Sequence, residues 1–315
     1  VDVRGQNQAK RALITAAAGG HHILFFGPPG SGKTMLASRL PGVLPPMTEA
    51  EALEVASIHS LKAGQGAIGW KQRPFRAPHH TSSAISLAGG GSQPRPGEIS
   101  YAHNGVLFLD EMPEFQRQAL EILREPLESG EVIITRVRGS ERYPASFQLI
   151  GAMNPCPCGY LGDQQRSCRC SPEQITRYRN RLSGPLMDRI DLQIEVASQS
   201  TQVILGDQNS GAGQSVNSRE ARQQVIKARE RQLKRQGKTN ARLSVKELQR
   251  VCQLGQQEKG LLTRLGDRLG ISARALHRTL RVARTLADLD ASEPVLKQHL
   301  AEAVQLRRLD SAKQP

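Results

Sequence analysis

The 315-residue sequence contains few aromatic side chains and no long apolar run. Aromatic residues make up 3% of the chain, with a single Trp, which argues against the base-stacking platforms of RNA-recognition and OB domains. The longest apolar runs, such as residues 106–109, are far shorter than the roughly 20 residues that a membrane-spanning helix needs. No basic segment followed by an apolar one opens the chain, so nothing indicates export. We therefore expect a soluble, cytoplasmic protein with no membrane partner.

Acidic residues are also scarce relative to basic ones, with 29 Asp and Glu against 43 Lys and Arg, for a formal net charge of +14. Most of the excess lies in residues 206–315, which contain 22 basic and 11 acidic residues, whereas residues 1–205 contain 21 and 18. Such a basic tail indicates a polyanionic partner such as nucleic acid, contacted mainly through phosphate. The alternative is an ordinary solvated helical surface rich in Arg and Lys.

Apolar patterns predict strands that alternate with helices, as in an α/β protein with a parallel sheet. The predicted strands are residues 22–26, 105–109, 132–137 and 147–153. The predicted helices are residues 2–18, 33–40, 49–61, 114–129 and 273–289. Residues 64–97, rich in Gly, Pro and Ser, indicate long loops or inserted hairpins rather than core. A low-complexity linker at 198–218 divides the chain into an α/β domain, residues 1–205, and a basic helical domain, residues 206–315.

Residues 27–34 match the phosphate-binding loop pattern G-x-x-x-x-G-K-[ST], between the strand and the helix that this motif requires. Its glycines let backbone N–H groups wrap around phosphates, Lys33 offers a charge to the β and γ oxygens, and the Thr34 hydroxyl can ligate Mg²⁺. We therefore predict an ATP site with Mg²⁺ as cofactor. The predicted nucleotide-binding residues are Gly27, Pro28, Pro29, Gly30, Ser31, Gly32, Lys33, Thr34 and Asp110.

Asp110 and Glu111 follow the apolar strand at 105–109, at the carboxyl end where ligands bind in open α/β sheets. We expect Asp110 to orient Mg²⁺ through its water shell, and Glu111, pointing the other way, to activate the water that attacks the γ-phosphate. On its own, an Asp-Glu pair is a common surface dipeptide. The phosphate-binding loop upstream favours the catalytic interpretation.

Four of the five cysteines are grouped, at Cys156, Cys158, Cys168 and Cys170. Two closely spaced pairs of thiols can hold a tetrahedral Zn²⁺ ion, and a cytosolic setting disfavours stable disulfides. The C-x-C spacing is tighter than the usual C-x₂-C, so unligated or redox-active thiols are the alternative. A closed four-thiolate site would be structural, bracing the loop that leads on to residue 189.

Together, several segments resemble the Mg-chelatase-like AAA+ ATPases, most closely the ComM/YifB family. The resemblance covers essentially the whole chain and rests on the loop at 27–34, RPFRAPHH at 73–80, GGGS at 89–92 and LFLDE at 107–111. It implies an AAA+ core with inserted hairpins and a C-terminal helical lid. It also implies a hexameric DNA helicase that drives branch migration by ATP hydrolysis during homologous recombination in natural transformation. The family carries an N-terminal Lon-like domain, and Val1 in place of Met indicates a fragment that lacks it.

The resemblance also implies roles for single residues near the expected site. Asn154 matches the sensor 1 position, which holds the attacking water, although an Asn before Pro155 is also typical of a turn. Arg189 matches the arginine finger, which reaches the γ-phosphate bound by a neighbouring subunit. A salt bridge from Arg189 to Asp188 or Asp191 is the alternative. Competing finger positions lie nearby, namely Arg179 and Arg181.

Arg274 matches the sensor 2 position, at the start of the helix predicted for residues 273–289 with Ser272 as its N-cap. Arg278 and Arg281 extend it into a basic stripe, while apolar residues supply the packing face. The segment 269–272 also resembles the turn of a helix-turn-helix, so direct reading of a DNA major groove is the rival interpretation. The phosphate-binding loop upstream favours the sensor role.

Two inserted segments, residues 73–100 and 131–148, match elements that face the central pore in related rings. Arginines in these segments are candidates for contacts with DNA phosphates: Arg76, Arg95, Arg136 and Arg138. Exposed loop arginines without a partner are the alternative. We assign no metal to His79 and His80.

These observations favour an ATP-hydrolysing AAA+ motor that acts on single-stranded or branched DNA as a homo-oligomeric ring. One alternative is a metal-chelatase ATPase subunit that remodels a partner protein and does not touch nucleic acid. Another is a helix-turn-helix DNA-binding protein gated by ATP. The basic tail favours DNA over the chelatase function.

Overall fold

The structure is a computed structural model and describes residues 5–61, 69–91, 94–136, 139–163, 166–198, 217–269 and 272–307. The chain forms two compact units. The sheet unit comprises Phe25–Pro41 and Pro46–Arg189, and the helical unit comprises Val1–Leu24, Gly42–Pro45 and Ile190–Pro315. The helical unit therefore draws on both ends of the chain. The predicted linker at 198–218 lies almost wholly outside the described residues.

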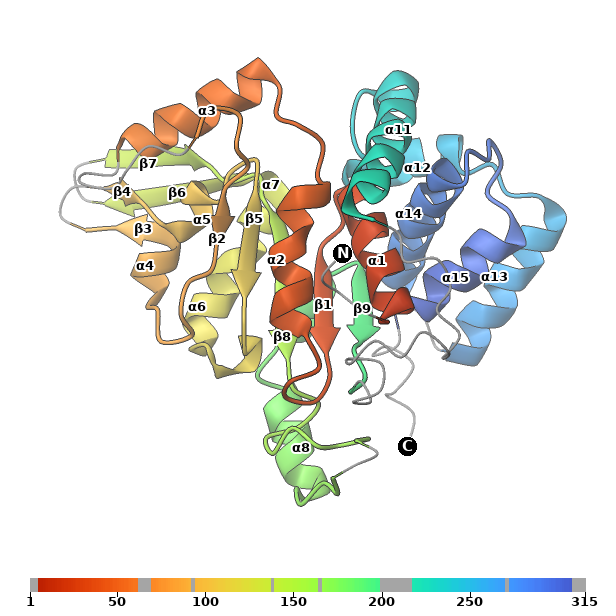
Figure 1. Cartoon of the computed structure of the whole chain (residues 1–315), viewed down its shortest axis with the longest axis horizontal. Helices are drawn as coiled ribbons and strands as arrows, with labels where there is room; N and C mark the ends of the chain where they lie inside the picture. Colours follow the sequence, from red (N-terminus) through yellow and green to blue (C-terminus); the bar gives the residue numbers. More distant parts are fainter. Residues whose placement is uncertain are drawn as a thin grey trace. The chain divides into compact units, whose positions relative to one another are not determined.

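A five-stranded sheet in the order β2-β5-β8-β1-β9 is the framework of the α/β fold (Figure 1). Its strands are β1 (Ile23–Phe26), β2 (Phe75–Arg76), β5 (Val106–Leu109), β8 (Gln148–Met153) and β9 (Leu192–Glu195). β5 pairs in parallel with β2 on one side and with β8 on the other. All residues of β1, β5 and β8 are buried, as in parallel strands that are covered on both faces. The predicted parallel sheet is confirmed.

Helices and hairpins complete the sheet unit. The two longest helices are α2 (Lys33–Val43) and α3 (Glu49–Ser60). α3 begins with a capping box. The Thr48 hydroxyl accepts the backbone N–H of Glu51, and the Glu51 carboxylate accepts the backbone N–H of Thr48. Two antiparallel hairpins are inserted, β3 (Gly89–Gly90) with β4 (Arg95–Pro96) and β6 (Glu131–Arg136) with β7 (Gly139–Pro144). These pairs confirm the predicted inserted hairpins.

Two local predictions were wrong. The segment 64–97 was expected to hold no core element, yet it supplies β2 to the central sheet, together with α4 (Ala84–Ala88). Two residues are too short to show a period, so only pairing with β5 reveals this strand. The single helix expected at 114–129 is broken into η1 (Met112–Glu114), α6 (Arg117–Glu121), η2 (Ile122–Arg124) and α7 (Pro126–Ser129). Pro126 starts α7, because a proline fits the first turn of a helix but not its interior.

The helical unit packs several helices around α14 (Ala273–Leu289), which contacts α1, α11, α12 and α15. The other elements of this unit are α1 (Asn7–Gly19), α11 (Ser218–Gln236), η3 (Asn240–Arg242), α12 (Val245–Val251), α13 (Gln256–Leu269) and α15 (Lys297–Gln305). Both ends of α14 match the prediction, and the Ser272 side chain accepts the N–H of Ala275 as its N-cap. Among the described helices, none has the length and apolar character needed to cross a membrane.

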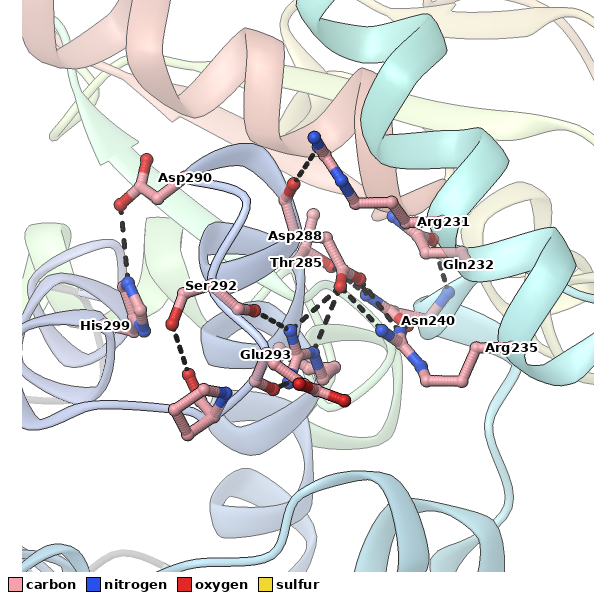
Figure 2. A network of polar contacts seen from close by, with 12 residues as sticks. Arg231, Gln232, Arg235, Asn240, Thr285, Asp288, Asp290, Ser292, Glu293 and His299 are labelled. Carbon is pink, nitrogen blue, oxygen red and sulfur yellow. Dashed lines mark hydrogen bonds and ion pairs between the residues drawn. The ribbon is translucent and has the colours of Figure 1, made fainter.

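A buried network of charged side chains lies within the helical unit (Figure 2). The Asp288 carboxylate accepts hydrogen bonds from Arg235, Arg284 and Asn240 at 2.7–3.2 Å. The guanidinium of Arg284 is only 2% exposed, and its other N–H groups donate to backbone oxygens of residues 292–293. Buried charges are tolerated only when they are paired in this way. The network therefore ties α11, η3 and α14 together.

Thr285 extends this network toward the start of β9. Its hydroxyl contacts Asn240 at 3.1 Å and the ring of His21 at 2.7 Å. The other ring nitrogen of His21 lies 3.1 Å from the Asp191 carboxylate, which also accepts a 2.8 Å hydrogen bond from Arg278. Although burial opposes ionisation, the hydrogen bond with His21 and the charge of Arg278 hold the pKa of Asp191 well below its usual range.

Candidate nucleotide-hydrolysis site

The phosphate-binding loop connects β1 to α2 at the carboxyl end of the sheet (Figure 1). Gly30 and Gly32 have φ angles of +77° and +91°, in the left-handed region that favours glycine. The N–H of Gly27 donates to the oxygen of Met153 at 3.2 Å, which fixes the start of the loop to the end of β8. The local backbone therefore has the conformation that the motif predicts.

Lys33 lies inside this loop and is buried. Its Nζ donates to the backbone oxygens of Gly27 and Pro28, at 2.8 Å each, and to Oδ1 of Asn154 at 3.3 Å. Burial lowers the pKa of Lys33, although the nearby carboxylates of Asp110 and Glu111 oppose this shift. The structure thus brings the loop lysine and the predicted sensor residue into direct contact.

Asp110 directly follows β5, and its side chain contacts the first turn of α2. Its Oδ2 accepts a hydrogen bond of 2.7 Å from the Thr34 hydroxyl, and its Oδ1 accepts the N–H of Glu111 at 3.0 Å. In an octahedral Mg²⁺ site with bonds of about 2.1 Å, neighbouring ligand oxygens lie about 3 Å apart. The paired oxygens of Thr34 and Asp110 therefore fit Mg²⁺ directly or through its water shell.

Glu111 has an unusual backbone conformation, with φ 48° and ψ 43° in the left-handed region. Such a conformation is costly for a residue with a side chain and is found most often at functional sites. The side chain of Glu111 is 53% exposed. The carboxylate is therefore accessible to a water molecule, as a general base must be.

His80 contacts Glu111, a pair that sequence reasoning missed. Nδ1 of His80 lies 3.2 Å from Oε2 of Glu111, and its ring packs 4.1 Å from that of His79, centre to centre. The signal that could have found the pair is β2, because residues that follow a strand of the central sheet reach its carboxyl edge. Without that strand, residues 79–80 looked like part of a loop.

Arg189 is held by contacts within its own chain. Its guanidinium donates to the oxygens of Arg124 at 3.1 Å and Pro185 at 2.6 Å and pairs with Glu128 at 2.5 Å, which leaves the side chain 11% exposed. The ion pair considered from the sequence, with Asp188 or Asp191, is not found among the described residues. Of the competing positions, Arg179 donates to the oxygen of Pro155, and Arg181 pairs with Glu114 while staying 51% exposed.

Arg274 is exposed in the first turn of α14, within the helical unit. The remainder of its predicted stripe is not free, because Arg278 pairs with Asp191 and Arg281 is largely enclosed, which lowers its pKa. Residues 282–288 of α14 are buried, so only its first turns could reach a DNA groove. This packing favours a structural helix over a recognition helix.

The four predicted DNA-contacting arginines have different surroundings. Arg76 makes a two-pronged ion pair with Glu98, at 2.5 and 2.8 Å. Arg95 is exposed on β4. Arg136 is the last residue of β6, and Arg138 lies outside the described residues.

The four grouped cysteines converge, with all sulfur atoms within 4.8 Å of one another. The sulfur of Cys156 lies 3.4 Å from that of Cys158 and 3.7 Å from that of Cys168, and Cys158 and Cys168 are 3.6 Å apart. In a tetrahedral site with Zn–S bonds of about 2.3 Å, sulfur atoms lie about 3.8 Å apart. Backbone N–H groups of Tyr160 and Arg169 lower the pKa of Cys158 to about 6, whereas burial and the neighbouring thiols raise the pKa of Cys168 and Cys170, as expected when several thiols share one site. The donor set fits Zn²⁺.

The cysteine cluster adjoins the phosphate-binding loop. Gly159, directly after Cys158, has φ +86° and packs against Pro29. A Cβ added at Gly159 would lie 2.7 Å from a ring carbon of that proline, so only glycine permits this approach. Order in the cluster can therefore be transmitted to the nucleotide site.

Comparison with known proteins agrees with this geometry. The family described as "Magnesium chelatase, subunit ChlI" matches residues 1–204, and its C-terminal family, "Magnesium chelatase, subunit ChlI C-terminal", matches residues 215–307. The chain belongs to the magnesium chelatase ChlI family. This confirms the resemblance to Mg-chelatase-like AAA+ proteins and the fold class of an AAA+ domain followed by a helical domain.

Within the ChlI family, the chain is similar to the "Competence protein ComM" of Haemophilus influenzae, at 52% identity over 98% of this chain and 60% of that protein. It is 50% identical to the "Uncharacterized protein YifB" of Escherichia coli, with the same coverage. The chain thus spans about three fifths of the length of these relatives. A "Magnesium-chelatase 38 kDa subunit" of Acidiphilium rubrum is 28% identical over 48% of the chain. The ChlI family supports an ATPase that uses ATP and Mg²⁺.

Proposed function

We propose that the protein is the ATPase part of an AAA+ motor that acts on DNA, and specifically of a hexameric helicase that promotes branch migration in natural transformation. One observation above all supports ATP hydrolysis. Five side chains converge at one edge of the sheet, namely Lys33, Thr34, Asp110, Glu111 and Asn154. These residues come from the loop after β1 and from the ends of β5 and β8, so only the folded sheet assembles them.

Each residue of the site has a chemical task. The loop N–H groups of residues 27–34 bind the phosphates, and Lys33 can exchange its two backbone acceptors for phosphate oxygens. Thr34 and Asp110 hold Mg²⁺, which neutralises charge that develops on the phosphates. Glu111 takes the proton from the attacking water, and Asn154 orients that water.

His80 is a positioning residue for Glu111 in this scheme. The contact between its Nδ1 and the glutamate carboxylate limits the directions in which the base can point. Because the glutamate carboxylate is half exposed, this contact is the main restraint that the described residues place on it. Rearrangement of His80 would therefore move the base relative to the nucleotide.

DNA as the substrate is supported by charge and by relatives. The chain carries a net charge of +14, and a relative at 52% identity is named a competence protein. We propose that Arg95, Arg136 and Arg138 of the inserted hairpins contact phosphates. Arg76 would contribute only by exchanging its partner Glu98 for a phosphate.

We also propose ring assembly with hydrolysis in trans. Arg189 would act as the finger of the neighbouring subunit once its ion pair with Glu128 opens, and Arg274 would act as sensor 2 from the helical unit. The paired state of Arg189 in an isolated chain is then a resting state. Arg181, with half of its side chain exposed, is the competing candidate.

A structural Zn²⁺ at the cysteine cluster completes the proposal. The sulfur separations match a tetrahedral site, and the contact between Gly159 and Pro29 gives the metal a route by which to stiffen the phosphate-binding loop. The metal would supply structure rather than chemistry, because four thiolates leave no open coordination position.

The test is ATP turnover with and without DNA, using Glu111→Gln against a matched control. Glu111→Gln should retain ATP binding and lose turnover by about 10²-fold or more, because only the base is removed. Glu49→Gln, an exposed carboxylate on α3, should turn over normally. Loss of ATP binding in the Glu111 variant would contradict its role as a base.

DNA dependence separates this proposal from its main alternative, an ATPase subunit that remodels a protein partner. That alternative is favoured by the similarity to magnesium-chelatase subunits at 28% identity. A motor on DNA should hydrolyse ATP faster when DNA is added. An ATP turnover rate that is the same with and without DNA, over a range of salt concentrations, would favour the chelatase-type function.

A further inference from the structure

We propose that a groove between α8 (Pro172–Arg179) and the start of α6 is a second binding site for the phosphate backbone of nucleic acid. This α8 groove has a volume of about 720 Å³. The side chains that give it its character are Arg117, Thr176, Arg177, Asn180 and Arg181. It lies apart from the inserted hairpins, and the inference rests on the proposed action on DNA.

The α8 groove carries positive charge that the protein leaves unbalanced. Among the described residues, Arg117 and Arg177 form no hydrogen bond or ion pair, whereas Arg181 is paired with Glu114. The acid near Arg117 is Glu121, which is hydrogen-bonded to Ser183 and Arg124 and interacts with Arg117 only through its charge. Two guanidinium groups that have no hydrogen bond or ion pair among the described residues thus line one groove.

The one acid in the groove lining is also engaged. Glu173 lies in the first turn of α8, where hydrogen bonds from the Ser171 side chain and from its own backbone N–H lower its pKa. It therefore stays ionised, and its single negative charge faces three arginines in the lining, Arg117, Arg177 and Arg181. The net charge that a ligand would meet is positive.

The α8 groove is rigidly built and tied to the nucleotide site. α8 starts with a capping box between Ser171 and Gln174, directly after the last cysteine of the cluster. Tyr178, buried between Arg177 and Arg179, anchors the helix, and the backbone N–H of Asn154 bonds its hydroxyl. Figure 1 shows α8 at the same end of the sheet unit as the phosphate-binding loop. A ligand that moves α8 would therefore move residue 154.

The chemistry of the α8 groove fits phosphodiesters. Guanidinium groups form paired hydrogen bonds to phosphate oxygens, and the side-chain amide of Asn180 adds a further donor. The Thr176 hydroxyl already donates to the backbone oxygen of Pro172 at 2.9 Å. Phe115, the aromatic residue of the lining, is only 4% exposed and cannot stack on a base. Binding should therefore be independent of sequence. A second copy of this chain, with a net charge of +14, is a poorer electrostatic match than a polyanion.

The experiment measures DNA affinity as a function of salt for wild type, Arg117→Ala/Arg177→Ala and a control, Arg250→Ala, which removes an exposed arginine from α12. Each phosphate contact contributes about 0.7–0.9 to the slope of log affinity against log salt. The double variant should lower that slope by about 1.5 and weaken binding at low salt on the order of tenfold. Basal ATP turnover and the control slope should not change.

A second variant checks that charge rather than folding is responsible. Arg117→Lys/Arg177→Lys keeps both charges and should restore most of the slope. If wild type binds DNA normally and the alanine variant has an unchanged slope, the groove is not a DNA site, while the proposed action on DNA still stands. A changed oligomeric state with a normal slope would reassign the groove to contacts between subunits. If wild type does not bind DNA at all, the proposed function fails and the groove with it.

Discussion

Replacing Asp288 should destabilise the helical unit more than any surface substitution. Its carboxylate is 1% exposed and accepts hydrogen bonds from Arg235, Arg284 and Asn240. Asp288→Asn keeps the shape but removes the charge and places an N–H₂ group against other donors. The 2%-exposed guanidinium of Arg284 then loses its only anionic partner among the described residues.

The expected loss follows from how each partner is buried. Removing one member of a buried ion pair costs about 3–5 kcal/mol, because the other charge stays buried without compensation. Arg284 retains two backbone acceptors, and Arg235, at 29% exposure, can be rehydrated at little cost. We therefore expect a loss of about 3 kcal/mol in the free energy of unfolding, a large part of the roughly 5–15 kcal/mol typical of a domain.

Hydrogen exchange followed by mass spectrometry measures this loss locally, in peptides from α11 and α14. Fluorescence of Trp70, the only tryptophan, reports on the sheet unit and should be unchanged. Arg231→Ala is the matched control, because it removes a donor to the backbone oxygen of Asp288 and leaves the carboxylate paired. Combining Asp288→Asn with Arg284→Met should recover part of the stability. A loss below about 1 kcal/mol, or an equal loss in the control, would refute the assignment of a buried charge network.

Three further predictions concern catalysis, metal and pH. Arg189→Ala and Lys33→Ala should each be inactive, and turnover should return when the two proteins are mixed and assemble into the same rings. Glu128→Gln should keep turnover if Arg189 is an arginine finger, and it should destabilise the chain if the ion pair of Arg189 with Glu128 is structural. Protein purified without added metal should contain one zinc per chain by elemental analysis, and near-zero zinc with four titratable thiols would reject the site. Burial lowers the pKa of His22 to about 4, so stability that is present above about pH 6.5 should decline toward pH 4 as the unfolded chain takes up the proton first. Thermal melts at pH 7.5 and 5 should show this decline, and His22→Gln should reduce it.

Local sequence determined those features whose physical cause lies within a few residues. The phosphate-binding loop needs glycines at its left-handed positions, and Gly30 and Gly32 occupy them. The N-cap Ser272 and the apolar face that follows it predicted both ends of α14. The spacing of the cysteines predicted a cluster, which the loop geometry can close without help from distant segments.

Only the tertiary structure decided features that depend on residues far apart in the chain. β2 is too short to be seen without its partner β5, so the contact of His80 with Glu111 was invisible in the sequence. The surroundings of arginines could not be predicted either, because a guanidinium pairs with whichever acid packing brings within reach. Arg189 pairs with Glu128, 61 residues earlier, rather than with an acid beside it, and Arg76 pairs with Glu98. Charge patterns along a chain show how many cations there are, whereas folding determines which of them remain free to bind a ligand.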